Sequence, residues 1–405
     1  MDLGRIWAEI DLDALNRNLD TIKQTLGPNK KIMLAIKADA YGHGAKEIAL
    51  ELEKKVDILG VAGVEEGIAL RYSGVKIPIL ILSPIPYFEI NALWEYNLIP
   101  TISEIDFARH LYESTKKKNA NMHVHIEVDT GMGRTGLDYD RALEQIQEIA
   151  NYKSLIIDGI FTHFPAADND VEFTREQIGK FANLCDKLHK IGITNFLRHS
   201  SNSAGFLNFP NADFDMIRPG LAVYGIPPKY LLNECRNCQL TPIMSLRSRI
   251  VNLRFVRQGQ SISYDRKYIT NRDSLIAVIT AGYGDGFPYA MQNCEVIVNV
   301  KNNKSAKPYR AKVVGNICMD LVMIDVTNIN GINIGDIVTL IGTVNGETIT
   351  AYDLANWANT IPYEIICRIS PRVPRVYLKN NKIVSVRNLL RTIGDNQLTL
   401  LSREF

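Results

Sequence analysis

Lys37 is the residue of this 405-residue chain whose position most directly suggests covalent chemistry. It follows the apolar segment 32–36, which is typical of a buried strand, and it precedes the glycine-punctuated turn Tyr41-Gly42-His43-Gly44. Burial favours a neutral amine, and a neutral amine can attack a carbonyl to form a Schiff base. The alternative is a lysine whose stem covers the strand end while its ammonium stays in water.

Other polar clusters also follow predicted strands. They are residues 127–134, 162–168, 199–205 and 218–221. Hydroxyls and free N–H groups at turns bind phosphate, which suits Asn202-Ser203 and Gly220-Leu221. The same residues also fit an ordinary helix cap and an ordinary turn. Together with Lys37, these residue types suit a phosphorylated aldehyde cofactor.

Arg134 follows the loop Asp129-Thr130-Gly131-Met132-Gly133. The two glycines let the chain approach a ligand closely, so Arg134 is a candidate binding residue. A surface ion pair with Asp129 is the alternative interpretation.

Alternating strand and helix patterns predict how these clusters are positioned. An amphipathic helix over 12–26 is followed by eight strand-like segments: 32–36, 56–61, 79–82, 98–102, 122–128, 155–161, 194–199 and 214–218. Helical patterns lie between them, at 65–72, 105–116, 139–150 and 172–191. Eight parallel strand–helix units favour a closed (β/α)8 TIM-type barrel, in which functional residues lie on the loops after the strands.

After residue 240 the pattern becomes strand-rich. Strands are predicted at 244–255, 274–280, 295–300, 312–325 and 337–341, with a short helix at 351–359. The sequence therefore predicts an α/β fold with a barrel over 1–238 and a C-terminal, mostly-β domain over 239–405. The tail after Val386 has no clear pattern.

Composition excludes several classes of partner. The 46 basic and 44 acidic side chains give a net charge of +2 without a basic run, so nucleic acid and anionic membranes are not expected as partners. The sequence shows no signal peptide and no segment that could span a bilayer, which favours a cytoplasmic protein. The six scattered cysteines suit reduced thiols. Cys235 and Cys238 form an incomplete C-x-x-C pattern, and no metal site is expected.

Residues 35–44, Ala-Ile-Lys-Ala-Asp-Ala-Tyr-Gly-His-Gly, resemble the pyridoxal-phosphate attachment motif of the bacterial alanine racemases. The resemblance covers nearly the whole chain and includes residues 7–11, 128–134, 162–164, 218–220, 263–264, 318–320 and 370–375. It implies an isomerase that interconverts L- and D-alanine, with a role in D-alanine biosynthesis or in catabolism. It also implies pyridoxal 5'-phosphate as the cofactor, a small amino acid as the substrate, and a homodimer whose subunits share each active site.

The resemblance also implies residue roles. Lys37 would hold the cofactor and act as one base, and Tyr264 of the partner subunit would act as the second base on the opposite face. His163 would stabilise the phenolate, while Arg218 would contact the ring nitrogen and keep it unprotonated. The phosphate would be held by Tyr41, Ser203, Gly220, Leu221 and Tyr363. Arg134 and the Met319 N–H, again from the partner, would hold the substrate carboxylate, and Tyr283 would line the access path.

Three positions depart from the family pattern. Glu127 stands where many members carry a carbamylated lysine, so we expect a permanent carboxylate to orient Arg134. Asn316 stands where an arginine is common along the access path, and Pro362 stands where asparagine is frequent.

Asn316 keeps open a broader racemase that acts on serine, lysine or arginine. A non-catalytic pyridoxal-phosphate-binding protein is disfavoured by Tyr264. A decarboxylase is disfavoured by Arg218, and a cofactor-free Schiff-base aldolase is the remaining barrel alternative.

Overall fold

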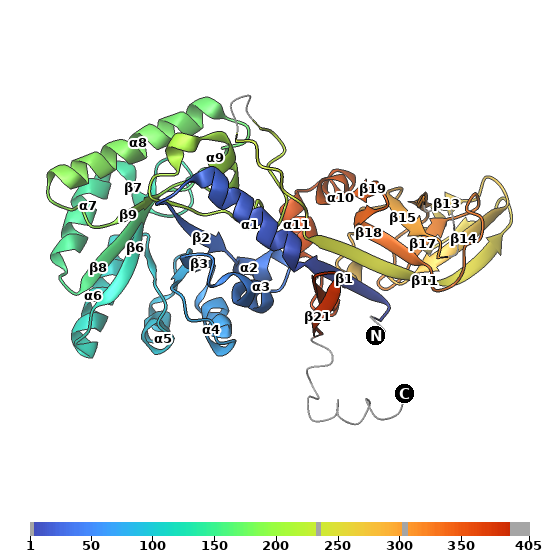
Figure 1. Cartoon of the computed structure of the whole chain (residues 1–405), viewed down its shortest axis with the longest axis horizontal. Helices are drawn as coiled ribbons and strands as arrows, with labels where there is room; N and C mark the ends of the chain where they lie inside the picture. Colours follow the sequence, from blue (N-terminus) through green and yellow to red (C-terminus); the bar gives the residue numbers. More distant parts are fainter. Residues whose placement is uncertain (1–3, 232–235, 302–306, 389–405) are drawn as a thin grey trace, which may run out of the picture. The chain divides into compact units, whose positions relative to one another are not determined.

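The computed structural model describes residues 4–231, 236–301 and 307–388, so Cys235 and the tail after Asn388 lie outside it. Its contacts group the chain into two compact units (Figure 1). The barrel unit comprises Leu15–Tyr41 and Ala45–Thr241. The β unit comprises Met1–Ala14, Gly42–Gly44 and Pro242–Phe405.

The barrel unit is built on eight parallel strands, as the sequence predicts. They are β2 (Lys31–Ala35), β3 (Ile58–Val61), β4 (Ile79–Ile81), β5 (Thr101–Ile102), β6 (Met122–Asp129), β8 (Leu155–Phe161), β9 (Leu197–His199) and β10 (Met216–Ile217). Two ladders, β10-β2-β3-β4 and β5-β6-β8-β9, make up the wall, and β7 (Leu137–Asp138) pairs with the end of β6. The two ladders meet at two places. A parallel bridge between Leu80 and Ile99 joins them next to β4. Next to β10, Arg218 N donates to Ser201 O at 2.8 Å, which closes the barrel.

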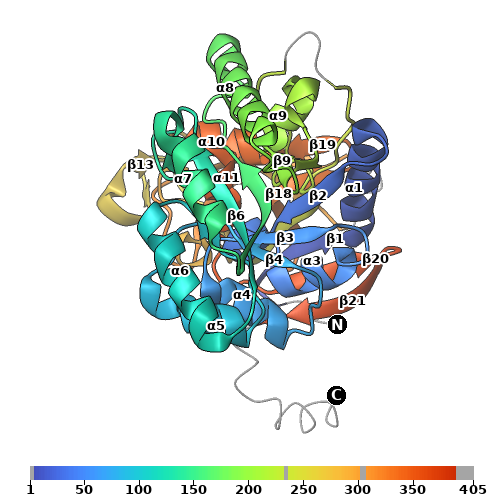
Figure 2. The same cartoon turned by 90° about the vertical axis from the view of Figure 1, so that its left-hand side faces the viewer.

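Helices alternate with these strands, and Figure 2 shows α4 to α8 on the outside of the strands. They are α1 (Leu12–Leu26), α3 (Ala45–Leu52), α4 (Val64–Tyr72), α5 (Ile90–Glu95), α6 (Ile105–Lys118), α7 (Tyr139–Asn151), α8 (Val171–Lys190) and α9 (Ser203–Asn208). Side chains fix where several of them begin: Asp138 caps α7, and Asp170 accepts a hydrogen bond from Phe173 N at 3.1 Å at the start of α8. The five helices predicted in this region, which correspond to α1, α4, α6, α7 and α8, are confirmed to within two residues.

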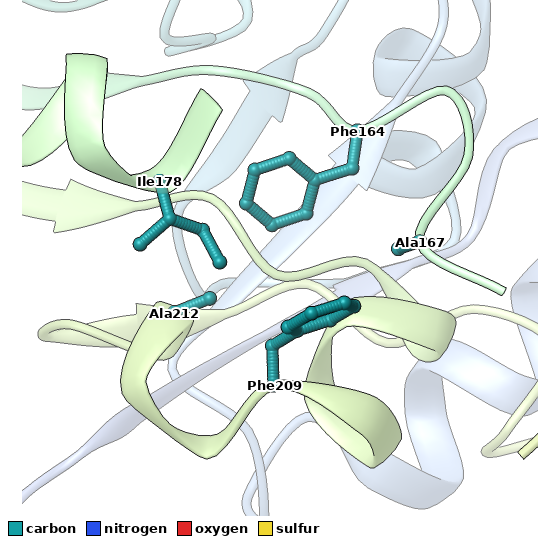
Figure 3. Packing of buried hydrophobic residues seen from close by; sticks show 5 residues of the cluster. All are labelled: Phe164, Ala167, Ile178, Phe209 and Ala212. Atoms are coloured by element: carbon teal, nitrogen blue, oxygen red, sulfur yellow. The ribbon is translucent and has the colours of Figure 1, made fainter. Parts of the chain in front are cut away.

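A small apolar cluster supports the loops after β8 and β9. Phe164, Ala167, Ile178, Phe209 and Ala212 are all buried, and Figure 3 shows the two phenyl rings and the Ile178 side chain pointing toward one another. Ile178 belongs to α8, whereas Phe164 directly follows His163. Burial of these side chains therefore anchors the loop that carries His163.

The β unit contains a ten-stranded sheet in the order β19-β18-β15-β16-β17-β14-β11-β1-β20-β21, in which β18 also pairs with β11. The strands are β1 (Ile6–Asp11), β11 (Met244–Val256), β14 (Ser274–Ile279), β15 (Glu295–Asn299), β16 (Tyr309–Val313), β17 (Val322–Asp325), β18 (Ile337–Val344), β19 (Glu347–Ile349), β20 (Arg375–Lys379) and β21 (Lys382–Arg387). A separate ribbon pairs β12 (Ser261–Ile262) with β13 (Tyr268–Ile269), and the helices are α10 (Ala351–Ala358) and α11 (Pro362–Cys367). The β18–β11 pairing closes six strands into a second, smaller barrel.

One predicted strand of this unit is wrong. Residues 312–325 form the two strands β16 and β17, and the loop 314–321 separates them. Gly315 lies in this loop with φ = 73°, a conformation that a continuous strand does not contain. The loop carries Asn316, Cys318 and Met319.

Arg375 fixes the short segment Gly42–Gly44 within the β unit. Its Nε donates to Gly42 O at 3.0 Å, and its other nitrogens donate to the carbonyls of Ile369, Ser370 and Val373. Tyr377 Oη donates to His43 O at 3.0 Å. Buried guanidinium groups are tolerated when such bonds satisfy them, so the chain just after Tyr41 is held by residues more than 300 positions away.

Among the helices of the described residues, none combines the length and the apolar character that crossing a membrane requires.

Candidate active site

Lys37 begins a single left-handed turn at the end of β2. Ala38, Asp39 and Ala40 all have φ and ψ between 46° and 54°, and Tyr41 has φ = 52°. Such a turn costs about 1–2 kcal/mol per residue for L-amino acids, so surrounding contacts must hold it. Glu66 accepts a hydrogen bond from Ala38 N at 2.6 Å, and Asp39 accepts one from Ala45 N at 2.8 Å. These contacts fix the backbone that carries the Lys37 amine.

Arg218, at the end of β10, donates to four acceptors that carry no charge. One terminal nitrogen donates to the carbonyls of Thr162 at 2.8 Å and Ser200 at 3.1 Å, and to His163 Nδ1 at 3.1 Å. The other donates to His199 Nδ1 at 3.1 Å. The side chain is 5% exposed, and burial lowers its pKa to about 10, so it remains charged at neutral pH.

The Nε–H of Arg218 donates to no residue in the described part of the chain. It is thus available to a further uncharged acceptor. A protonated ring nitrogen would not suit this position, because it is itself a donor and Arg218 supplies only donors.

The hydrogen bonds of Arg218 determine the tautomers of two histidines. Because a guanidinium only donates, Nδ1 of both His163 and His199 must accept, and the proton of each neutral ring is on Nε2. His199 Nε2 then donates to His125 Nδ1, 2.9 Å away. Burial and the Arg218 charge hold the pKa of His163 well below its usual range, and the charges of Arg134 and Lys37 lower it further. His163 is therefore neutral, with an Nε2–H that it can donate.

Ser203 and Gly220 meet where the loops after β9 and β10 approach each other. Ser203 Oγ accepts hydrogen bonds from Gly220 N at 3.0 Å and from Ala222 N at 3.2 Å. A Cβ at residue 220 would lie 2.7 Å from Tyr41 Oη, so only glycine lets the tyrosine approach this closely. Asn202 caps the following helix through Gly205 N. The structure thus brings together the residues predicted to hold a phosphate in this unit: Tyr41, Asn202, Ser203, Gly220 and Leu221.

The Arg134 loop is shaped by Asp129. Its carboxylate accepts hydrogen bonds from the N–H groups of residues 131, 132 and 133, at 2.7 to 2.9 Å. Asp129 thus has a structural role, and Arg134 extends from the loop as an exposed side chain.

Glu127 does not orient Arg134 as the sequence suggests. Within the residues that the structure covers, no ion pair joins the two, and Glu127 accepts a hydrogen bond from Ser103 Oγ at 3.1 Å. Glu127 is 3% exposed, and its negative charge favours the protonated form of Arg218. It acts as the buried counter-charge to Arg218.

The remaining predicted residues belong to the β unit. Tyr264 is 68% exposed and begins a turn between β12 and β13, beside a hollow of about 990 Å³ that Cys318 and Leu321 also line. The exposed Met319 has an N–H that donates to no acceptor among the described residues. Tyr363 lies exposed on α11, which Pro362 begins, and proline suits this first helical position because φ is already fixed there.

Tyr283, predicted to line the access path, is also exposed in the β unit. Its backbone N–H donates to Cys318 O at 3.1 Å, and Gly284 N donates to Met319 O. A Cβ at Gly282 would lie 2.2 Å from Met319 O, so this close approach requires glycine. The segment 282–284 therefore fixes the loop that presents Met319.

The sequence interpretation overlooked His125 and the link that His199 makes to Arg218. The signal is that His125 and Glu127 alternate with apolar residues in β6, because every second residue of a barrel strand faces the interior. Polar residues at interior positions of an apolar strand point to a buried network.

Two family models match the chain: alanine racemase, N-terminal domain, over residues 10–228, and alanine racemase, C-terminal domain, over residues 243–377. A relative named alanine racemase from Halothermothrix orenii is 42% identical over 93% of this chain and 97% of its own length. The solved alanine racemase of Clostridium difficile 630 is 36% identical, with a TM-score of 0.86, and 95% of this chain and 98% of that chain are covered.

A solved alanine racemase from Bartonella henselae contains covalently bound pyridoxal phosphate. It is 26% identical with a TM-score of 0.81, over 93% of this chain and all of that chain. The two family models together account for most of the sequence, and the buried Arg218, the strand-end Lys37 and the contact between Ser203 and Gly220 lie within the match to the first. The chain belongs to the alanine racemase family.

Proposed function

We propose that this racemase interconverts L- and D-alanine with pyridoxal 5'-phosphate as cofactor and with Lys37 and Tyr264 as two opposed bases. The observation that carries the proposal is the arrangement around Arg218, a buried cation with a free Nε–H among neutral acceptors, in the same unit as Lys37. Such a group suits an unprotonated pyridine nitrogen.

The residues of the barrel unit fit the cofactor. Lys37 would hold it covalently, and Arg218 would contact its ring nitrogen. The Ser203 hydroxyl, which accepts from Gly220 N and keeps its own hydrogen to donate, would bind the phosphate beside Gly220. The close approach of Tyr41 Oη to Gly220 supports this assignment, because it leaves a phenol hydroxyl and a backbone amide side by side. When bound, the cofactor supplies an electron sink that makes the substrate α-proton acidic.

Arg218 explains why racemisation is favoured over related chemistry. A guanidinium does not give up its proton readily, so a pyridine nitrogen beside it stays unprotonated. By keeping that nitrogen unprotonated, Arg218 would moderate the electron withdrawal that the cofactor supplies, and this would limit the side reactions open to a long-lived carbanion. A decarboxylase or a transaminase would be served better by an acid at this position.

Racemisation requires one group to remove a proton from one face and another to return a proton to the opposite face. Lys37 would act on one face and Tyr264 of the partner subunit on the other. A phenol is a poor base at neutral pH unless its phenolate is stabilised, and the neutral His163 offers an Nε2–H for that purpose. Arg134 and the free Met319 N–H would hold the substrate carboxylate.

The proposal includes a homodimer in the cytoplasm, with residues 1–238 and 239–405 contributing different parts of each site. The strong exposure of Tyr264 supports a shared site, because a base in open solvent would lack the enclosed surroundings that tune it. The five cysteines of the described residues are free thiols, which suits a reducing compartment.

The test is a visible spectrum of the purified holoenzyme before and after borohydride, followed by peptide mapping of the reduced lysine. The proposal predicts an absorbance band of the bound cofactor that borohydride removes, with the label on Lys37. A label on any other lysine would overturn the site assignment. Turnover of alanine, serine, lysine and arginine by the same preparation measures the substrate range, and alanine is expected to be turned over fastest.

A further inference from the structure

Tyr264 lies in a turn of unusual backbone conformation. Ser263 has φ = 68° and ψ = −174°, a combination that is almost confined to glycine, while Asp265 and Arg266 have φ values of 61° and 52°. Side chains with a Cβ rarely adopt these conformations, so contacts with the surroundings must hold the turn. The Tyr264 side chain is too exposed to supply them.

Asn316 contacts three consecutive residues of this turn. Its Nδ2 donates to Tyr264 O at 3.1 Å and to Asp265 Oδ2 at 2.9 Å. Its backbone carbonyl accepts a hydrogen bond from Ser263 Oγ at 2.5 Å. Because a carbonyl and a carboxylate can only accept, the amide nitrogen must be the atom that faces the turn.

Gly315 permits this approach. It has φ = 73°, and a Cβ there would lie 2.7 Å from Ile262 O and 2.8 Å from Ser263 Cβ. The segment 315–316 is thus packed directly against the backbone that leads into Tyr264. Asn316 itself is 1% exposed, which differs from the expectation that residue 316 lines an open access path.

We propose that Asn316 is a positioning residue that fixes the direction of the Tyr264 phenol through the Ser263–Asp265 turn. This inference rests on the proposed role of Tyr264 as a base. The short amide of Asn316 bonds the turn directly. Asn316, which the sequence places along the access path, therefore holds the backbone of the second base in position.

The experiment compares two rates in the holoenzyme: racemisation of alanine, and exchange of the α-hydrogen for solvent deuterium with retention of configuration. The second rate reports the Lys37 face alone. Asn316→Asp keeps the shape of the side chain but replaces both donated bonds by repulsion between acceptors. We expect racemisation to fall about tenfold or more, since small misplacements of a catalytic group cost one to two orders of magnitude, while retentive exchange of one enantiomer changes less than about twofold.

Two further variants isolate the effect. In the double variant Asn316→Asp with Asp265→Asn, residue 265 can donate to residue 316, and we expect much of the lost racemisation to return. If the aspartate variant does not fold, Asn316→Ser takes its place. It keeps one short donor, and its loss of racemisation should be intermediate. Asn18→Ala is the matched control, because Asn18 is also buried and donates to two carbonyls, those of Val223 and Thr241, in the barrel unit. It should lower the thermal midpoint without changing the ratio of the two rates.

Parallel loss of both rates, with no rescue in the double variant, would show that Asn316 only supports the fold and would overturn the inference. Unchanged racemisation would also overturn it. A change confined to the relative turnover of serine and lysine would overturn it as well, because it would mean that Asn316 affects substrate access. Wild-type protein that binds the cofactor at Lys37 but does not racemise alanine would instead reject the proposed function, on which the inference depends.

Discussion

Arg218 organises the chemistry at the scale of single residues. It carries a charge into the barrel interior, where Glu127 balances it and neutral acceptors surround it. One side of its guanidinium fixes His163, and the other begins the chain through His199 to His125. The protonation states of three histidines thus follow from one residue that only donates.

These tautomers can be measured. With the histidine nitrogens labelled, long-range proton–nitrogen correlation spectra of the holoenzyme should assign His163, His199 and His125 as neutral Nε2–H tautomers at pH 7. They should remain so at pH 5.5, because burial holds the pKa of each well below its usual range, to about 3 for His125. A charged His163 at pH 7 would contradict the arrangement, because it would place two donors face to face.

The sequence could predict the residue types at the strand ends but not these bonds. Lys37, Arg218 and Ser203 are identifiable because each follows an apolar strand. The partners of Arg218 are two backbone carbonyls and two ring nitrogens, and their positions depend on barrel closure. The pairing of Glu127 with Ser103 instead of Arg134 follows from the same closure.

At the scale of elements, the turns after the strands determine the site. The left-handed turn after Lys37 and the turn around Tyr264 both contain residues other than glycine with positive φ, a conformation that is unfavourable for residues with a Cβ. Neither is visible in the sequence, because Ala-Asp-Ala-Tyr and Ser-Tyr-Asp-Arg do not encode a positive φ. The strands were predictable because their apolar residues are local signals, whereas the split of 312–325 depends on Gly315 packing against Ile262.

A substitution at Gly220 tests the proposed phosphate site at this scale. Gly220→Ala should weaken cofactor binding by about tenfold or more, because the new methyl group would lie 2.7 Å from Tyr41 Oη and push the phenol away. Equilibrium titration of the apoenzyme with cofactor measures the effect. The control is Gly179→Ala in α8, where nothing lies within 4 Å of the new Cβ. Equal cofactor affinity in the Gly220 variant and in wild type would argue against a phosphate at Gly220.

At the scale of the whole molecule, each unit depends on pairings between distant parts of the sequence. In the β unit, β1 lies between β11 and β20, and Ala8 is paired with both Leu246 and Arg375. A six-residue strand at the start of the chain gives no local hint of this arrangement, so neither β1 nor β20 was predicted. Arg375 adds a buried anchor for Gly42–Gly44.

The buried histidines make stability depend on pH. Their folded-state pKa lies below the unfolded value of about 6.5, so the unfolded chain binds protons first as the pH falls. The contribution of these neutral histidines to the free energy of unfolding should therefore be complete above about pH 6.5. At lower pH the free energy of unfolding should decrease, by about 1.4 kcal/mol per pH unit for each histidine. Urea titrations of the holoenzyme between pH 7.5 and 5.5 measure the slope.

His125→Asn should reduce this slope by the share of one histidine. His110→Asn, at an exposed position, should leave it unchanged. If both variants kept the wild-type slope, His125 would not be the group that titrates.

A shared active site predicts complementation between two inactive variants. When subunits carrying Lys37→Ala are mixed with subunits carrying Tyr264→Phe, half of the dimers at random exchange are mixed, and each has one intact site. Activity should therefore return to about a quarter of the wild-type value in a two-fold symmetric dimer. Each variant incubated alone provides the baseline. No recovery, despite subunit exchange shown by native mass spectrometry, would place Lys37 and Tyr264 of one site in the same chain.

The most direct test of two opposed bases is Tyr264→Phe in deuterium oxide. We predict that this variant retains the cofactor on Lys37 and exchanges the α-hydrogen of one enantiomer, while racemisation falls by about a hundredfold or more. If both enantiomers still exchange and interconvert at the wild-type rate, Tyr264 is not the second base and the account is contradicted.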